Sequence, residues 1–202
     1  KKLVLLGDLL SDRAFNDWFT LEIIDVLSQQ GQDFDIIFSN HDAAFVEYYL
    51  ANKDKTSDQA YSAAPDNLSH AVRPNTSLIR LNNLLNQEPT RRAEFHRLAQ
   101  TYLSRVSIVG CSQDQATVYS HGVLNENMMA DMLTLAGVNP AEQGNLGLQE
   151  KVRTINAYFR TNAFGNVEAF RDVMRKPGED DPDVPDTGRH PFFFAIWNKG
   201  PF

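Results

Sequence analysis

Polar side chains that can bind a metal or transfer a proton follow three short apolar runs of this sequence. The runs are Lys2–Leu6, Phe34–Phe38 and Thr117–Tyr119. The polar segments that follow them are Gly7-Asp8 with Asp12-Arg13, Ser39-Asn40-His41-Asp42, and Ser120-His121-Gly122. The carboxyl ends of sheet strands are where α/β proteins build their sites. We therefore expect the three polar segments to meet.

Asp, Asn and His together are ligands for a hard or borderline divalent cation. A cation held by Asp8, Asn40 and His121 would polarise a phosphoryl oxygen and acidify a bound water. The planar guanidinium of Arg13 suits two oxygens of a phosphate. His41 follows Asn40 directly and could donate a proton to a leaving alkoxide.

Either of two carboxylates, Asp12 or Asp42, could hold the imidazole of His41 in the right tautomer. Each motif alone is weak, because Asn and Asp also favour turns and helix caps. Three such motifs in order, each after an apolar run, are much harder to obtain by chance. The residues therefore favour phosphoryl-transfer chemistry over a purely structural role.

The first sixty residues alternate between strand and helix patterns. The apolar run 3–6 is typical of a strand buried on both faces. In residues 15–30, Phe19, Ile23, Val26 and Leu27 fall on one face of a helix, and Gly31 stops it. Residues 34–38 form the second strand, and Asp42 could cap a helix over 43–51. This order predicts a parallel α/β sheet with right-handed crossovers.

The remaining sequence is mostly helical. Residues 52–73 are polar and predict an exposed loop or cap insertion, and residues 177–188 predict a solvated acidic loop. Helices are predicted at 76–87, 90–105, 125–136, 148–159 and 167–174. Short strands are predicted at 106–109 and 116–119 around a hairpin-like turn, and a core strand at 192–197.

Length, net charge and cysteine content limit the classes of protein to which this chain can belong. The 202 residues are enough for one domain with a substantial core. A net charge of −7 and a pI near 5.2 argue against nucleic acid as a partner. Cys111 is the single cysteine, and no apolar run approaches the ~20 residues that span a bilayer. The sequence thus predicts a soluble, cytoplasmic protein without a membrane span, and it says nothing of oligomeric state.

The three motifs resemble the second, third and fourth signatures of the calcineurin-like metallophosphoesterases. The Arg after Asp12 is similar to that of the phosphoprotein phosphatases within this family. The resemblance implies a single α/β domain over 1–202, a β-sandwich flanked by helices, with a helical cap inserted at 43–105. The large helical insertions are similar to those of bacterial effector phosphatases such as WipA and WipB. That narrower resemblance implies delivery into a host cell.

The resemblance also implies a role for each site residue. Asp8 would bridge two divalent metal ions, with Asn40 and His121 as ligands of the second. Mn²⁺ is favoured, with Fe, Zn and Mg as alternatives. A metal-bound hydroxide would attack phosphorus in a phosphomonoester of a phosphoprotein or phosphopeptide. His41 would be the general acid, Asp12 its partner and Arg13 the phosphate clamp.

The sequence departs from the family pattern at several points. An Asp-x-His signature would lie before Lys1 and a Gly-His signature after Phe202, so we expect a domain incomplete at both ends that binds metal poorly. Ser39 and Ala14 replace glycines. One extra residue separates Asp8 from Asp12, so either a bulge restores the Asp12–His41 pair or Asp42 orients His41.

Three alternatives remain open. A dinucleoside polyphosphate hydrolase would share the Gly-Asp…Arg and Asn-His motifs. A phosphatase-like binding module without catalysis is compatible with the replaced glycines. A generic α/β scaffold would carry the motifs by accident.

Overall fold

The computed structural model describes residues 2–12, 16–62, 76–174 and 191–197. The chain has the predicted mixed α/β composition and divides into two compact units. Unit 1 comprises Lys1–Ile36 and Asn40–Val106, and unit 2 comprises Ile37–Ser39 and Ser107–Phe202. Among the described helices, none is long and apolar enough to cross a membrane. The acidic segment 177–188 and its predicted loop lie outside the described residues.

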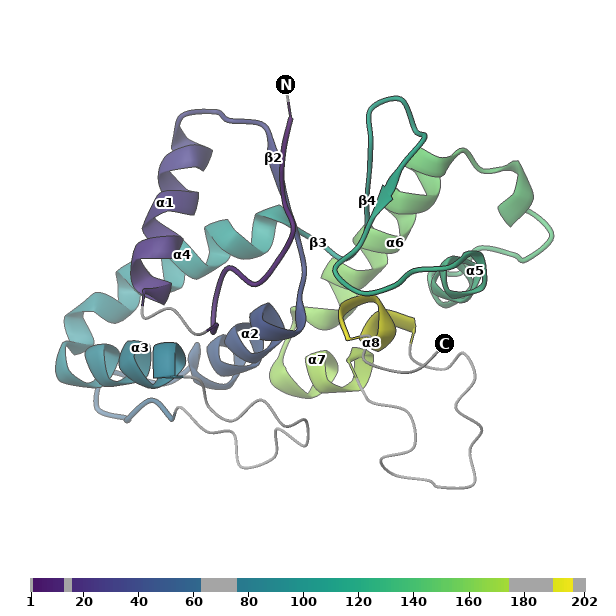
Figure 1. Cartoon of the computed structure of the whole chain (residues 1–202). Coiled ribbons are helices and arrows are strands. Elements are labelled where there is room, and N and C mark those ends of the chain that lie inside the picture. The colour runs from purple at the N-terminus through teal and green to yellow at the C-terminus, as the bar shows by residue number, and fades with distance from the viewer. Residues whose placement is uncertain (1, 13–15, 63–75, 175–190, 198–202) are drawn as a thin grey trace. The chain divides into compact units, whose positions relative to one another are not determined.

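The sheet of unit 1 contains the predicted βαβ arrangement (Figure 1). Strands β1 (Leu3–Leu5), β2 (Phe34–Ile37) and β3 (Val106–Ser107) have the order β1-β2-β3. β1 and β2 are parallel, with Leu3 opposite Phe34 and Leu5 opposite Ile36. The prediction that β1 is buried on both faces is wrong, since Leu3 is 40% exposed. β1 is at the edge of the described sheet, so only one of its sides is covered by a strand.

Helix α1 (Asp17–Gln29) connects β1 to β2 and ends, as predicted, before Gly31, whose φ is +69°. Its predicted apolar face is not the buried one, because Phe19, Ile23 and Val26 are about half exposed. The opposite face is buried, and it carries Leu21, Ile24 and Asp25. Successive helix residues differ by about 100°, which places these two sets on opposite sides of α1.

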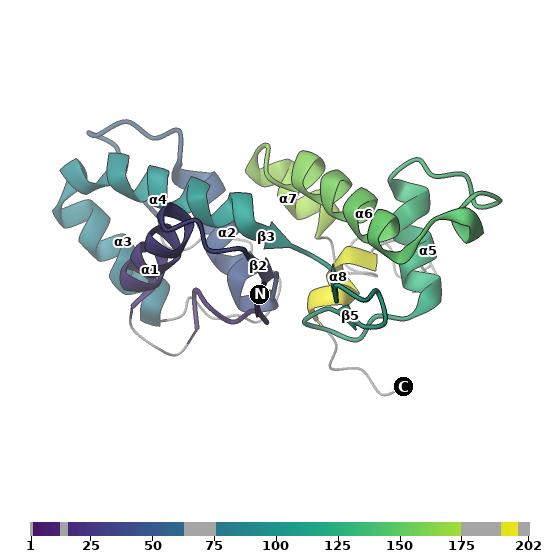
Figure 2. The same ribbon diagram turned by 90° about the horizontal axis from the view of Figure 1, so that it is seen from above.

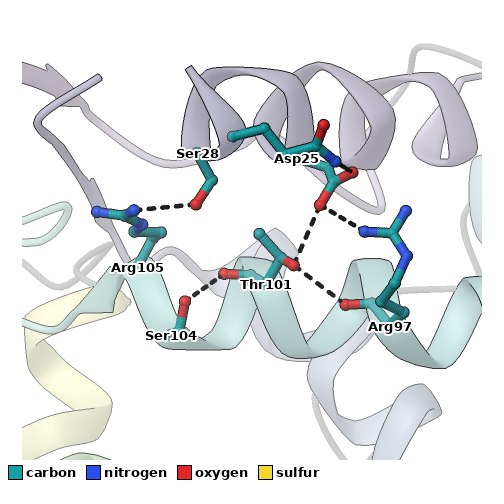
Figure 3. Close-up of polar contacts among 7 residues, drawn as sticks. Asp25, Ser28, Arg97, Thr101, Ser104 and Arg105 are labelled. Atoms are coloured by element: carbon teal, nitrogen blue, oxygen red, sulfur yellow. Dashed lines mark hydrogen bonds and ion pairs between the residues drawn. The ribbon is translucent and has the colours of Figure 1, made fainter. Parts of the chain in front are cut away.

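The buried face of α1 packs on helix α4 (Arg92–Arg105) through polar contacts (Figure 3). Arg97 donates a 2.7 Å hydrogen bond to the Asp25 carboxylate, and Thr101 donates another at 3.3 Å. Arg105 donates to the Ser28 hydroxyl at 2.9 Å. A carboxylate is therefore buried here because charged and hydroxyl donors replace its lost water.

Among the described residues, unit 1 also contains α2 (Asn40–Asn52), α3 (Thr76–Gln87) and the short 3₁₀ helix η1 (Pro89–Arg91). The predicted helices at 76–87 and 90–105 are confirmed. The prediction that Asp42 caps the second helix is wrong, because α2 already begins at Asn40. The aromatic core includes Phe45, whose ring lies 6.1 Å from that of Phe95 and 5.6 Å from that of Tyr102. Burying each such ring contributes about 1.5–3 kcal/mol.

Unit 2 combines a hairpin with helices (Figures 1 and 2). Strand β4 (Gly110–Cys111) pairs antiparallel with β5 (Val118–Tyr119), which confirms the hairpin although the first strand lies later than predicted. The helical segments are α5 (Glu126–Leu135), η2 (Gln143–Asn145), α6 (Leu148–Ala163), α7 (Val167–Val173) and α8 (Pro191–Ile196). The Asn156 carboxamide of α6 accepts from Ile108 and Val109 N–H and donates to Val109 O, which fixes the approach to β4.

The prediction of a strand at 192–197 is wrong, because this run forms α8 (yellow in Figure 1). Its predicted place in a core is confirmed: Phe192 is 2% exposed and stacks on Phe159 with 5.6 Å between ring centroids. A short apolar run alone does not distinguish a buried strand from a buried helix. Pro191 at the first helical position favours the helix, since proline is pre-organised there.

Candidate functional site

The parallel pairing of β1 and β2 places two predicted site segments at one edge of the unit 1 sheet. The segment Gly7–Asp12 follows β1, and Asn40-His41 open helix α2 just after β2. Parallel strands end at the same edge, so their following residues emerge together. The structure brings Asp12 and His41 within 3.8 Å of each other, and the predicted residues Asp8 and Asn40 lie on the same two segments of unit 1.

The segment after β1 is a turn built from left-handed residues. Gly7, Asp8 and Ser11 have φ values of +83°, +55° and +54°. Glycine adopts this region freely and Asp tolerates it, whereas a left-handed Ser is unusual. The chain follows this path despite the extra residue between Asp8 and Asp12. The predicted bulge therefore takes the form of a turn with left-handed positions.

Two buried carboxylates hold the backbone of this turn. Asp42, in the first turn of α2, accepts a 3.1 Å hydrogen bond from the Leu10 N–H. Asp17, the first residue of α1, accepts a 2.9 Å hydrogen bond from the Ser11 N–H. Both side chains are buried, with exposed fractions of 0% and 4%. Consecutive N–H groups of the turn are thus fixed by two different helices.

His41 is held by the same turn. Its Nδ1 lies 3.0 Å from the Ser11 carbonyl oxygen, and its Nε2 lies 3.8 Å from Asp12 Oδ1. A carbonyl oxygen only accepts hydrogen bonds, so Nδ1 carries a proton and donates it. Nε2 is then the nitrogen that gains or loses a proton, and it faces the Asp12 carboxylate. The ring is 24% exposed, which leaves it accessible to a substrate.

The tautomer of His41 is therefore set by the backbone carbonyl of Ser11. The sequence predicted that the carboxylate of Asp12 or Asp42 would set it. Asp12 still lies beside the ring, as the first alternative requires, but at Nε2. Asp42 is hydrogen-bonded to the turn at Leu10. The predicted pairing of Asp12 with His41 is thus present in the structure, at the long end of ion-pair distances.

Sequence reasoning missed Asp17. An acidic residue at a helix start is ordinarily explained by the helix dipole, so its type and place gave no signal. In the structure Asp17 is buried, and that burial raises its pKa, although the Ser77 hydroxyl and the hydrogen bond from the Ser11 N–H lower it in part. Burial, with the charge of Asp42, also raises the pKa of Tyr102 well above its usual value.

The predicted ligand His121 lies in unit 2, just after β5. The Ser120 hydroxyl donates a 2.6 Å hydrogen bond to Gly122 O, and Gly122 N–H donates to Ala195 O of α8 at 2.6 Å. A Cβ at Gly122 would lie 2.9 Å from Ala195 O and closer still to Phe194 O. The missing side chain of Gly122 therefore permits the close approach that holds the His121 turn.

The donors of unit 1 suit a hard divalent cation. Asp8 offers an exposed carboxylate and Asn40 a half-buried carboxamide at neighbouring strand ends. Within the described part of the chain, no three His, Cys, Asp or Glu side chains gather in a metal-binding arrangement. The complete ligand set of Asp8, Asn40 and His121 stays a prediction. Arg13, the predicted phosphate clamp, lies outside the described residues.

Comparison with known proteins adds independent findings. Residues 2–201 match the family model described as "WipA-like, phosphatase domain". The fold is similar to a solved structure, that of the phosphatase domain from the Legionella effector WipB, with a TM-score of 0.68 and 24% identity. That likeness covers 86% of this chain but only 57% of the WipB chain. No curated protein matches the sequence significantly.

Proposed function

This chain belongs to the WipA-like phosphatase-domain family, and on that premise we propose that it is a metal-dependent phosphatase of the calcineurin-like type that hydrolyses phosphomonoesters. The observation that carries the proposal is the setting of His41. Its Nδ1 is engaged by Ser11 O, and its Nε2 faces Asp12 at the edge where two parallel strands end. A β-sandwich architecture, characteristic of that type, is part of the same proposal.

His41 is the general acid in this proposal. Water adds across the ester bond: its oxygen bonds to phosphorus, the P–O bond to the alcohol breaks, and the leaving oxygen takes the Nε2 proton of His41. The Asp12 carboxylate lies 3.8 Å from Nε2 and is the proposed partner of His41. Arg13, next to Asp12, would bind two phosphate oxygens.

Asp8, Asn40 and His121 would hold two divalent metal ions, with Mn²⁺ favoured. Metal ions bound there supply Lewis-acid polarisation of the phosphate and a more acidic water. The ordering of the Gly7–Asp12 turn by Asp42 and Asp17 supports this role for Asp8, because a ligand on a fixed backbone loses less freedom on binding.

The substrate in this proposal is a phosphoprotein or phosphopeptide, and the protein acts after delivery into a host cell. The comparison structure comes from a Legionella effector, which supports this setting. The match covers little more than half of the length of the WipB chain. The substrate and the partners of this protein are therefore proposed and are not taken from that structure. Hydrolysis of a dinucleoside polyphosphate is the second candidate, since the Gly-Asp and Asn-His segments suit it equally.

The test compares leaving groups in His41→Ala. p-Nitrophenolate leaves without protonation, whereas the alkoxide of phosphoserine needs an acid. We expect the variant to lose about 10²–10⁴-fold in kcat on a phosphoserine peptide. The loss on p-nitrophenyl phosphate should be much smaller. His96→Ala is the matched control, because His96 lies on α4 and bonds to Tyr49. Equal losses on both substrates would contradict an acid role, and an inactive wild type would favour a binding module.

A further inference from the structure

Asp17 contributes a buried carboxylate to the site that the proposed chemistry does not use. It is the first residue of α1 and is 4% exposed. Acidic residues at helix starts are ordinarily solvated and interact with the helix dipole. Asp17 instead points away from bulk water and accepts the Ser11 N–H at 2.9 Å. Burying a carboxylate is unfavourable unless hydrogen bonds replace its lost water, and the Ser11 N–H supplies one such bond.

Ser11 is the point through which Asp17 reaches His41. The Ser11 N–H is bound by Asp17, and the Ser11 C=O lies 3.0 Å from His41 Nδ1. Ser11 is also a non-glycine residue with a φ of +54°, a conformation that persists only when its surroundings over-determine it. Removing the Asp17 acceptor would free Ser11 to leave that conformation. The carbonyl that sets the His41 tautomer would then turn with it.

We propose that Asp17 is a positioning residue of the candidate active site, which fixes the protonation geometry of His41 through the backbone of Ser11. Asp42 supports the adjoining residue, Leu10, in the same way from α2. The role of Asp17 in catalysis rests on the proposed function, in which His41 is the general acid. The effect of Asp17 on the geometry of His41 does not depend on that function.

Two hydroxyl side chains from other helices adjoin the two carboxylates. The Ser77 hydroxyl of α3 partly offsets the increase that burial causes in the pKa of Asp17. Tyr102 of α4 is fully buried and interacts electrostatically with both Asp42 and Asp17. Four helices of unit 1 therefore contribute polar groups beneath the Leu10–Asp12 turn. The hydrogen bonds that hold the turn itself are those from Leu10 to Asp42 and from Ser11 to Asp17.

The test measures the His41 tautomer directly in the metal-free protein. Long-range ¹⁵N–¹H NMR at about pH 8.5, above the ordinary histidine pKa, shows which ring nitrogen is protonated. In the wild type we expect the proton on Nδ1, with the signal assigned by its loss in His41→Ala. Asp17→Ala should give a mixture of both tautomers. Asp17→Asn should restore the wild-type spectrum, because its amide oxygen still accepts from Ser11.

Asp25→Ala is the matched control on the same helix. Asp25 is also buried, but it binds Arg97 and Thr101 instead of the turn. It should lower stability without changing the His41 tautomer. In Mn²⁺-dependent assays, Asp17→Ala should lower kcat by about 10–100-fold with KM within about twofold, as expected for misplacement of a catalytic group. Asp17→Asn should stay within about threefold of the wild type.

Several results would overturn the proposal. One is a wild-type His41 protonated on Nε2, and another is Asp17→Ala with an unchanged tautomer and kcat. If Asp17→Ala does not fold, amide hydrogen exchange in the wild type decides instead. The Leu10 and Ser11 amides should then exchange slowly, and unprotected exchange contradicts the role. A wild type without phosphatase activity would refute the proposed function, whereas the tautomer comparison would still test Asp17.

Discussion

At the scale of single residues, Gly122 is a position where one methyl group should disturb the predicted ligand His121. Its N–H is bonded to Ala195 O at 2.6 Å, and an added Cβ would meet the backbone oxygens of α8. Backbone atoms cannot rotate away, so Gly122→Ala must separate the turn from α8. We expect a loss of about 1–3 kcal/mol in the free energy of unfolding, measured with urea.

Gly144→Ala is the control for that substitution. Gly144 also lies in unit 2, and a Cβ there meets nothing within 4 Å. It should leave the unfolding free energy within about 0.5 kcal/mol of the wild type. If Gly122→Ala behaves like Gly144→Ala, the close contact between the His121 turn and α8 is not present in solution.

The sequence predicted the partners at His41 only in part. Residue types and spacing placed Asp12 or Asp42 near the imidazole, and the structure brings Asp12 to 3.8 Å. The carbonyl of Ser11 could not be predicted, because every residue has a carbonyl and only the left-handed φ of Ser11 directs this one. Asp17 was missed for a related reason: its partner is a backbone N–H, which leaves no pattern in the sequence.

At the scale of elements, the contact between α1 and α4 should make stability depend on pH. The hydrogen bond from Arg97 lowers the pKa of Asp25 below its ordinary 3.8, against the effect of burial. A lowered pKa stabilises the fold above the unfolded-state value and loses this stabilisation as pH falls through the folded-state value. Asp25→Asn should therefore destabilise by about 1 kcal/mol at neutral pH.

Urea unfolding across pH tests this contact. The difference between wild type and Asp25→Asn should be constant above about pH 5 and shrink as pH falls below about 4. Asp33→Asn is the control, since it removes an exposed carboxylate of unit 1 outside the contact between α1 and α4. A difference that stays constant down to about pH 3 would mean that Arg97 does not hold Asp25 in solution.

Helix positions were easier to predict than helix faces. The positions of α1 and α3 follow from the periodicity of their apolar residues. The end of α1 also follows from Gly31, which has a φ of +69°. The buried face of α1 did not follow, because Arg97 lies far along the chain and makes a burial site for Asp25 that local periodicity cannot reveal. The run 191–196 shows the same limit, since its burial was predictable but its helical form depended on Pro191.

At the scale of the whole molecule, the site residues are divided between the units. Asp8, Asp12, Asn40 and His41 belong to unit 1, and His121 belongs to unit 2. The boundary passes through residues 37–39, which directly precede Asn40 and which carry Phe38 into the aromatic core of unit 2. The ring of Phe38 lies 5.4 Å from that of Phe159. The sequence motifs could be identified without knowledge of the two units, because each motif lies directly after a single strand.

Metal removal tests the ligand set as a whole. Chelation with EDTA should abolish hydrolysis of p-nitrophenyl phosphate, and Mn²⁺ should restore it, because the proposed chemistry needs a Lewis acid. Asp8→Asn and Asn40→Ala, in unit 1, and His121→Ala, in unit 2, should each raise the Mn²⁺ concentration for half-maximal rate by at least about tenfold. His96→Ala should not change it. If only the unit 1 variants respond, His121 is not a ligand, and activity that survives EDTA would contradict metal dependence altogether.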